Sequence, residues 1–343
     1  MILEILLIVI GFIILIKGAD LLVKAAISIA KRLGLSEMPI GLTILAVGTS
    51  LPEIFITITS AMEGHSDLII GNAIGSCICN FLFVIGIISL IKPIKFDKRI
   101  VKKHLPIGIA TMCLLLFLGN TNKLGNAQTI TRWQGAILIS YTIAYIIYSI
   151  YEEKKIHNEK IDEEIIKEVE SKENYSIGTI IIYMILGILG LKFGADFVVD
   201  NSVEIAKAIG LSEGFIGMTI VAIGTSLPEI TTGIISAKNN ETDLLLGNII
   251  GSNIINLCLL VGIGAIIKPL VFATNFNISI IILILVTIIL QLITTLNKKG
   301  ELNRKTGILF IIIYLIYIGG MALKTGWTLG TFLKVHFLWK KDK

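Results

Sequence analysis

The six-residue sequence GTSLPE occurs twice in this chain, at residues 48–53 and 224–229, and each copy stands inside a long apolar run. Around the two copies, residues 18–93 align with residues 194–269 without gaps, and about half of the aligned positions are identical. The identities include the polar and small residues of GAD, LSE, GTSLPE and GN..GS...N, which shared hydrophobicity alone does not produce. The chain therefore contains an internal duplication.

The composition around this repeat is that of an integral membrane protein. Of the 343 residues, 54% are hydrophobic and 16% are charged, whereas a soluble domain carries about 25% charged residues. No pattern of alternating polarity recurs over about ten residues, so we expect an all-α membrane protein. Because a membrane helix needs about 20 apolar residues, the apolar runs predict ten transmembrane helices, near residues 2–30, 38–62, 67–91, 105–119, 134–151, 177–206, 214–237, 242–267, 277–295 and 306–323.

A highly charged segment at residues 151–173 divides the predicted spans into two sets of five. The predicted organisation is a first five-helix repeat at 1–150, a cytoplasmic charged linker at 151–176, a second five-helix repeat at 177–325, and a C-terminal tail at 326–343 to which we assign no role. A short amphipathic helix and a regulatory cation site are alternative interpretations of the linker. Because five is odd, the second repeat enters the membrane in the opposite sense, which gives two inverted repeats.

Basic residues predict the orientation, because the cytoplasmic connections of membrane proteins are enriched in Lys and Arg. If the N-terminus is outside, the cytoplasmic connections hold most of the basic residues, namely Lys31, Arg32, Lys95, Lys98, Arg99, Lys102, Lys103, the lysines of the linker, Lys298, Lys299, Arg304 and Lys305. We therefore expect a multi-pass protein of the cell membrane with both termini external. The basic end of the tail, WKKDK, disagrees with this orientation, and we have no physical account of it.

Several classes of function are disfavoured by what the sequence lacks. The net charge of +5 is modest and falls mainly in connections, which does not indicate nucleic-acid binding. No GxxxxGK(S/T) sequence for a nucleotide and no HExxH sequence for zinc occurs, and the four cysteines lie within apolar runs. The histidines, which a serine hydrolase would need as a base, lie in connections, at a span end or in the tail, at His65, His104, His157 and His336. We expect no enzymatic activity and no cofactor.

Each GTSLPE copy places a carboxylate within an apolar span, at Glu53 and at Glu229. A charged side chain at the centre of a bilayer costs roughly 2.5–3.5 kcal/mol, so two at equivalent positions indicate a function. The preceding prolines, Pro52 and Pro228, free backbone carbonyl groups one turn earlier. Carboxylate, hydroxyl and carbonyl oxygens together are typical ligands of Ca²⁺ or Na⁺, whereas Zn²⁺ and copper prefer His or Cys.

The third span of each half carries a matching polar stripe at intervals of four residues, Asn72, Ser76 and Asn80 in one and Asn248, Ser252 and Asn256 in the other. Residues four apart lie on one face of a helix. We expect Asn80, Asn256 and the two serines to coordinate a cation, whereas hydrogen bonding between helices remains the alternative for Asn72 and Asn248. Adjacent GxxxG pairs predict close helix packing.

These paired motifs resemble the two α-repeats of the cation/calcium antiporter superfamily, specifically the prokaryotic sodium/calcium exchangers. The resemblance implies exchange of Na⁺ for Ca²⁺ by alternating access, with spans 2, 3, 7 and 8 forming the site and spans 1 and 6 sliding past it. It implies that Ca²⁺ binds Glu53, Glu229 and the backbone carbonyl groups of Thr49 and Thr225. It also implies that the Na⁺ sites include Ala46, Ala222, Ser50, Ser226, Ser76 and Ser252.

Asn80 matches the family pattern, whereas Asn256 stands where close relatives often carry an aspartate. The site thus holds two formal negative charges rather than three, which argues against dependence on K⁺. We expect Ca²⁺ export with Ca²⁺, Na⁺ and the lipid bilayer as partners, without nucleotide or nucleic acid and without a required oligomer. Exchange of Ca²⁺ for protons, transport of another divalent cation, a cation channel and an intramembrane hydrolase using Ser50 or Ser226 are the alternative functions.

Overall fold

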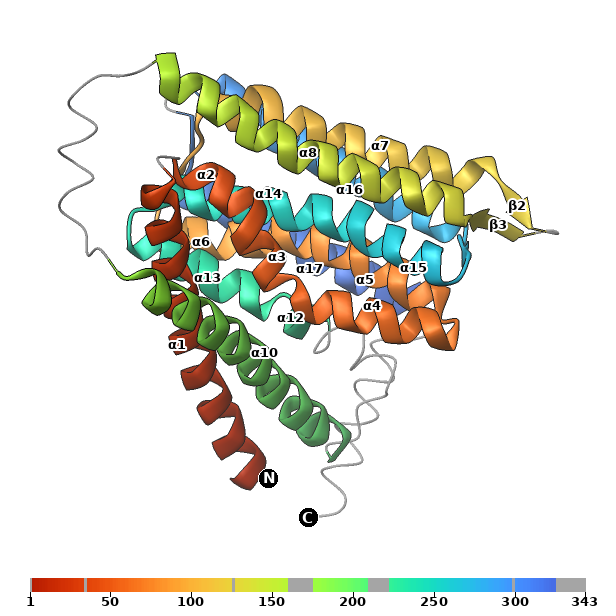
Figure 1. Ribbon diagram of the computed structural model, residues 1–343. Helices are drawn as coiled ribbons and strands as arrows, with labels where there is room; N and C mark the ends of the chain where they lie inside the picture. Colours follow the sequence, from red (N-terminus) through yellow and green to blue (C-terminus); the bar gives the residue numbers. More distant parts are fainter. Residues whose placement is uncertain are drawn as a thin grey trace.

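The computed structural model describes residues 2–33, 36–124, 127–159, 175–208, 222–297 and 300–324. Within them the chain is a bundle of helices with two very small sheets at its ends (Figure 1). Eight helices are long and apolar enough to cross a membrane, and nine if one bent pair counts as a span. The predicted all-helical membrane fold is confirmed at this level. The first part of the predicted span 214–237 lies outside the described residues, and so do residue 325 and the whole predicted tail, 326–343.

The first half of the chain begins with the long helix α1 (Ile2–Arg32). The second predicted span is broken into α2 (Glu37–Ile40), the π-helical turn η1 (Gly41–Leu45), α3 (Ala46–Thr49) and α4 (Leu51–Glu63). The third span comprises α5 (Ser66–Ile78), η2 (Cys79–Val84) and α6 (Ile85–Ile91). Then follow η3 (Ile100–His104), α7 (Leu105–Thr121) and α8 (Arg132–Glu159), so helix extends into the first residues of the predicted linker, of which residues 160–174 are not described.

Within the described residues, the main helices of the second half follow the same order. It begins with α10 (Ile177–Ala208), after which the described chain resumes at α12 (Ala222–Thr225) and α13 (Leu227–Lys238). The next span comprises α14 (Thr242–Ile254), η5 (Ile255–Leu260) and α15 (Val261–Ile267). The last two helices are α16 (Asn275–Leu296) and α17 (Arg304–Lys324).

A helix break precedes each glutamate of the two GTSLPE copies. Helices α2–α3 and α4 are bent by 50° relative to each other, and Ser50 at the junction has φ −87° and ψ 6°. Ser226 has nearly the same backbone angles, φ −91° and ψ 3°, between α12 and α13. Pro52 and Pro228 explain both breaks, because proline cannot donate the helical hydrogen bond and its ring crowds the preceding turn.

The loops gather at two ends of the bundle. At the first end, which we call the linker end, β1 (Ile94–Lys95) pairs with β5 (Glu301–Leu302). At the second end, which we call the three-strand end, β2 (Lys123–Leu124), β3 (Ala127–Ile130) and β4 (Leu270–Val271) form a sheet in that order. In Figure 1, β2 and β3 extend beyond the right-hand side of the bundle.

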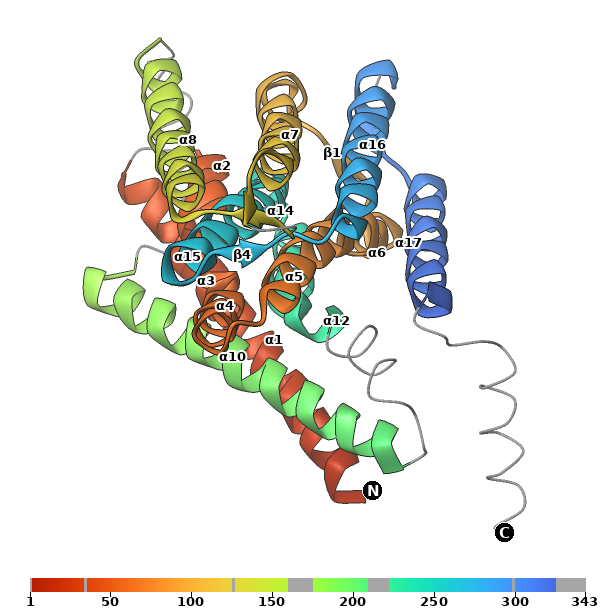
Figure 2. The same ribbon diagram turned by 90° about the vertical axis from the view of Figure 1, so that its right-hand side faces the viewer.

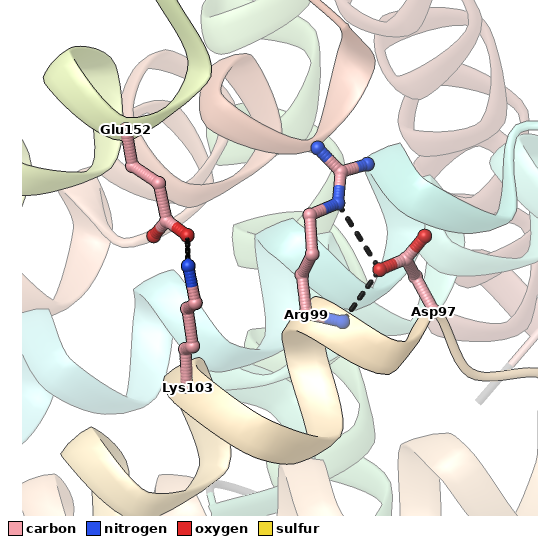
Figure 3. A network of polar contacts seen from close by, with 4 residues as sticks. All are labelled: Asp97, Arg99, Lys103 and Glu152. Atoms are coloured by element: carbon pink, nitrogen blue, oxygen red, sulfur yellow. Dashed lines mark hydrogen bonds and ion pairs between the residues drawn. The ribbon is translucent and has the colours of Figure 1, made fainter. Parts of the chain in front are cut away.

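Polar contacts at the linker end hold its loops and helix ends together. Lys103 in η3 forms an ion pair with Glu152 in α8, and Arg99 contacts Asp97 at 3.1 Å (Figure 3). All four residues lie in or beside segments that the lysine distribution predicts to be cytoplasmic.

The glutamate-bearing helices end at opposite ends of the bundle, and each end is contacted by a lysine of the other half. At the linker end, Lys92 after α6 donates hydrogen bonds to the carbonyl oxygen of Ala237 at 3.4 Å and to Asn240, just beyond α13. At the three-strand end, Lys268 packs against Gly64, just beyond α4. A β-carbon added to Gly64 would come 2.5 Å from the Nζ atom of Lys268. The equivalent helices α4 and α13 therefore run in opposite directions.

Burial separates central helices from peripheral ones. In the most apolar stretches of Thr242–Ile267 and Ser66–Ile91, 83% and 72% of the residues are buried. In the corresponding stretches of α1 and α10 the share is 22% each. Helices α1 and α10 pack along each other at glycines, since an added β-carbon at Gly18 would come 2.8 Å from the backbone of Gly190. Figure 2 shows the N-terminal end of α1 and the C-terminal end of α10 extending away from the central helices.

Close packing also unites the two halves at the centre. A β-carbon at Gly247 of α14 would come 2.5 Å from the carbonyl oxygen of Met38 in α2, so only a glycine permits this approach. The predicted role of this GxxxG pair in helix packing is confirmed. The equivalent partner of Gly71 and Gly75 falls in residues 209–221, outside the described part of the chain.

Candidate ion-binding site

Glu53 and Glu229 lie at the first turn of α4 and α13, directly after the two helix breaks. Their side chains are 0% and 1% exposed. The N-terminal end of a helix carries partial positive charge, which favours a carboxylate at this position. Although they come from opposite halves, the two glutamates approach the same place, because Ser50, three residues before Glu53, lies 3.5 Å from Oε1 of Glu229. The breaks therefore bring both predicted carboxylates into one buried region.

The carboxylate of Glu229 accepts hydrogen bonds from both halves of the protein. Ser252 of α14 donates to its Oε1 atom at 3.3 Å, and Ser50 at the first helix break donates to the same atom at 3.5 Å. By contrast, neither carboxylate oxygen of Glu53 has a hydrogen-bond donor among the described residues. The two glutamates are equivalent in sequence but differ in their surroundings.

The Thr49 hydroxyl group lies between the two halves and is fully buried. Its oxygen is 3.2 Å from Oδ1 of Asn248, 3.3 Å from Oγ of Ser252 and 3.3 Å from the carbonyl oxygen of Ala46. Asn248 in turn donates through Nδ2 to Oγ1 of Thr232 at 3.1 Å. Asn248 thus belongs to a hydrogen-bonded network that reaches Glu229, beyond the helix-packing role left open from the sequence.

The predicted ligands on the third span of each half lie in or next to a π-helical turn. Asn80 is in η2 and Asn256 is in η5, and both are fully buried. The Nδ2 atom of Asn80 donates to Oδ1 of Asn253 at 3.0 Å, and within the described residues its Oδ1 atom has no donor. Neither polar side-chain atom of Asn256 has a described hydrogen-bond partner. A π-helical turn redirects side chains and is frequent at functional sites.

The remaining predicted residues occupy the same breaks and stripes. Ser226 and Ser76 are 0% and 4% exposed, and their hydroxyl groups have no hydrogen-bond partner in the described ranges. Ala46 begins α3 and is buried, and Thr225 ends α12. Ala222 begins α12, and its side chain lies outside the described part of the structure.

Two polar residues of this region, Thr232 and Asn253, escape the sequence analysis. Thr232 is one turn after Glu229, and Asn253 lies between Ser252 and Asn256; they are 0% and 2% exposed. In the first half the equivalent positions hold Ile56 and Cys77. The repeat identifies positions that are identical in both copies, so comparing the copies does not single out residues that differ between them. Their burial among apolar residues is the signal that could have identified them.

The donor set has the chemistry of a hard-cation site. It combines two carboxylates with hydroxyl, amide and carbonyl oxygens, which are ligands that Ca²⁺ and Na⁺ prefer. The described residues contain no group of three or more His, Cys, Asp or Glu side chains that could hold a metal ion. With two formal negative charges, the site matches the charge of one divalent cation.

Comparison with known proteins identifies the family. The family model for the sodium/calcium exchanger protein matches residues 3–151 and 179–322. The chain belongs to the sodium/calcium exchanger family. The sodium/calcium exchanger MaX1 of Methanosarcina acetivorans is 28% identical to it, over 91% of this chain and 97% of its own length. CaxA of Alkalimonas amylolytica is 35% identical over 90% of this chain and 96% of its own length.

A solved structure agrees with this assignment. The sodium/calcium exchanger from Methanococcus jannaschii superposes with a TM-score of 0.76 at 30% sequence identity, covering 93% of this chain and 98% of that one. The family resemblance predicted from the GTSLPE and GN..GS...N motifs is confirmed.

Proposed function

We propose that the protein is a secondary antiporter that exchanges Na⁺ for Ca²⁺ by alternating access and exports Ca²⁺. The observation that carries this proposal is the meeting of Glu53 and Glu229, one from each half, at paired helix breaks inside a membrane bundle. Membership of the sodium/calcium exchanger family supports the same function. Buried carboxylates in a membrane protein mark an ion pathway.

The ligands in this proposal are those expected from the sequence. Ca²⁺ binds the carboxylates of Glu53 and Glu229 together with the backbone carbonyl groups of Thr49 and Thr225. Na⁺ uses oxygens of the same region, from Ala46, Ala222, Ser50, Ser226, Ser76, Ser252, Asn80 and Asn256. The full burial of Asn80 and Asn256 beside the two glutamate helices supports their inclusion. A shared set of ligands makes the two ions compete, which is the condition for exchange.

The proposed architecture is ten transmembrane helices in two inverted five-helix repeats, residues 1–150 and 177–325, joined by a cytoplasmic linker at 151–176. The opposite directions of α4 and α13, ending near Lys268 and Lys92 respectively, support the inversion. In this arrangement the linker end is cytoplasmic and both termini are external. An inverted repeat allows one site at mid-membrane to open to either side.

The proposed moving part is the pair α1 and α10. These helices contact each other at glycine backbones and are far less buried than the central helices, which supports movement of the pair as one body. The central helices α4, α5, α13 and α14 then keep the ligands together while access changes sides. Nucleotide takes no part, because the gradient of Na⁺ supplies the energy.

Transport in proteoliposomes tests the proposal. Purified protein is reconstituted into vesicles loaded with Na⁺, with K⁺ or with an acidic buffer, and ⁴⁵Ca²⁺ uptake is measured in a Na⁺-free medium. We expect uptake only with internal Na⁺ and without a requirement for K⁺. Uptake driven by acid loading would show exchange for protons, and uptake independent of the internal cation would show a channel. Either result would contradict Na⁺/Ca²⁺ exchange.

A further inference from the structure

The hydrogen bonds around Glu229 form a chain whose direction is fixed at one end by Thr232. The Thr232 hydroxyl lies 2.8 Å from the carbonyl oxygen of Pro228, one helical turn earlier, and donates its only proton there. Its oxygen must then accept from Asn248, whose Nδ2 atom is 3.1 Å away. This contact orients the Asn248 side chain, because the amide nitrogen faces Thr232 and the amide oxygen faces the other way.

The orientation passes from Asn248 to the two hydroxyl groups beside the glutamate. The amide oxygen of Asn248 lies 3.2 Å from the Thr49 hydroxyl, whose other acceptor is the carbonyl oxygen of Ala46 at 3.3 Å. Ser252, 3.3 Å from Thr49, directs its own proton to Oε1 of Glu229. Both hydroxyl protons are therefore held by acceptors of the protein. The lone pairs of Thr49 and Ser252 are left for a cation, which a hydroxyl can bind only through its oxygen. This adds the hydroxyl oxygen of Thr49 to its backbone carbonyl group among the proposed ligands.

Among the described residues, the first half has no equivalent of the hydrogen bond between Asn248 and Thr232. Ile56 occupies the position equivalent to Thr232, and Asn72 is the equivalent of Asn248. The Nδ2 atom of Asn72 has no hydrogen-bond partner among the described residues, and the same is true of Ser76 and of both Glu53 oxygens. Ile56 has no hydroxyl group, so it cannot accept a hydrogen bond from Asn72 as Thr232 accepts one from Asn248.

We propose that Thr232 and Asn248 are positioning residues that orient Thr49, Ser252 and Glu229 for the cation before it binds, so that the two glutamates are not equivalent. Oxygens that are already oriented lose less conformational freedom on binding, which raises affinity. This inference rests on the proposed function and specifies which half of the site is prepared. In this proposal neither Thr232 nor Asn248 is itself a ligand of the cation.

The test compares Thr232→Val with a matched control, Thr57→Val. Thr57 is also a buried threonine, 1% exposed, one turn after the other glutamate, but its hydroxyl makes no hydrogen bond within the described residues. Initial rates of Na⁺-driven ⁴⁵Ca²⁺ uptake are measured against Ca²⁺ concentration. Because one hydrogen bond typically changes an equilibrium about threefold to tenfold, Thr232→Val should raise KM for Ca²⁺ by that factor and leave the maximal rate within about twofold. Thr57→Val should change neither.

Two further variants separate positioning from a general loss of structure. Thr232→Ser keeps the hydroxyl and should restore the wild-type KM. In a double-mutant cycle, Thr232→Val and Ser252→Ala should be non-additive because they belong to one chain of hydrogen bonds, whereas Thr57→Val and Ser252→Ala should be additive. An unchanged KM in Thr232→Val, an equal rise in Thr57→Val, or failure of Thr232→Ser to restore KM would each overturn the inference.

Ca²⁺ binding measured without transport distinguishes this inference from the proposed function. In detergent, the thermal stabilisation by Ca²⁺ is titrated for Thr232→Val, Thr232→Ser and Thr57→Val, and its midpoint should shift in Thr232→Val alone. If the midpoint shifts as expected but the wild type shows no Na⁺-driven uptake, the positioning role stands and exchange fails. If exchange is present and no midpoint or KM shifts, exchange stands and the positioning role fails.

Discussion

Removing one negative charge from the site, by Glu53→Gln or Glu229→Gln, should abolish or nearly abolish Ca²⁺ transport while the protein still folds. Glutamine keeps the size of the side chain, and in Glu229→Gln the remaining carbonyl oxygen still accepts from Ser50 and Ser252. Glu53→Gln breaks no described hydrogen bond, because neither carboxylate oxygen has a donor in the described part of the chain. Each variant therefore changes charge without removing a packing contact.

The magnitude follows from the burial of the two carboxylates, which are 0% and 1% exposed. At an effective dielectric constant of about 20, two unit charges about 4 Å apart interact by about 4 kcal/mol. Ca²⁺ carries two charges, and part of this attraction offsets the loss of its hydration. A net loss of at least about 3 kcal/mol remains, which corresponds to a weakening of Ca²⁺ binding by more than about a hundredfold.

The assay is ⁴⁵Ca²⁺ uptake into Na⁺-loaded proteoliposomes, together with the thermal stability of each variant in detergent with and without Ca²⁺. Without Ca²⁺ the variants should be at least as stable as the wild type, because one of two neighbouring buried charges is gone. Added Ca²⁺ should stabilise only the wild type. Full Ca²⁺ flux in either variant would refute the assignment of the site.

Three other predictions concern the orientation in the membrane, the charge of the site and the contact of Lys92 with the end of α13. Cysteines placed at Lys98 and Lys299 should be labelled from the same, cytoplasmic side, and labelling from opposite sides would contradict the topology. Asn256→Asp should retain Ca²⁺ binding but make Na⁺-driven flux more sensitive to mild acid than in the wild type, because it adds a titratable group; identical pH profiles, or a K⁺ requirement in the wild type, would contradict this. Lys92→Met should lower thermal stability by about 0.5–1 kcal/mol with exchange retained, because a cation at the C-terminal end of α13 is lost; an unchanged melting temperature would show that the contact contributes nothing.

The sequence by itself determined the class of the fold and the central residues of the proposed site. A carboxylate and a proline are costly in an apolar helix, so GTSLPE stands out wherever it occurs, and its repetition identifies Glu53 and Glu229 without any coordinates. The helix breaks at Ser50 and Ser226 follow from the same prolines, because the steric cause is local. The apolar runs likewise predicted the long spans, since membrane thickness sets their length.

Only the tertiary structure decided which of these residues touch. Thr49, Thr232 and Asn248 lie on different helices, and their hydrogen bonds depend on how α14 packs against the two glutamate helices. That approach in turn depends on backbone contacts such as Gly247 against Met38, which are far apart in the sequence. A repeat in the sequence predicts a symmetric site, yet Ser50 and Ser252 donate to Glu229, whereas neither carboxylate oxygen of Glu53 has a donor among the described residues. Hydrogen bonds between helices depend on three-dimensional distance and on the number of available protons, and neither is written in the spacing of residues along the chain.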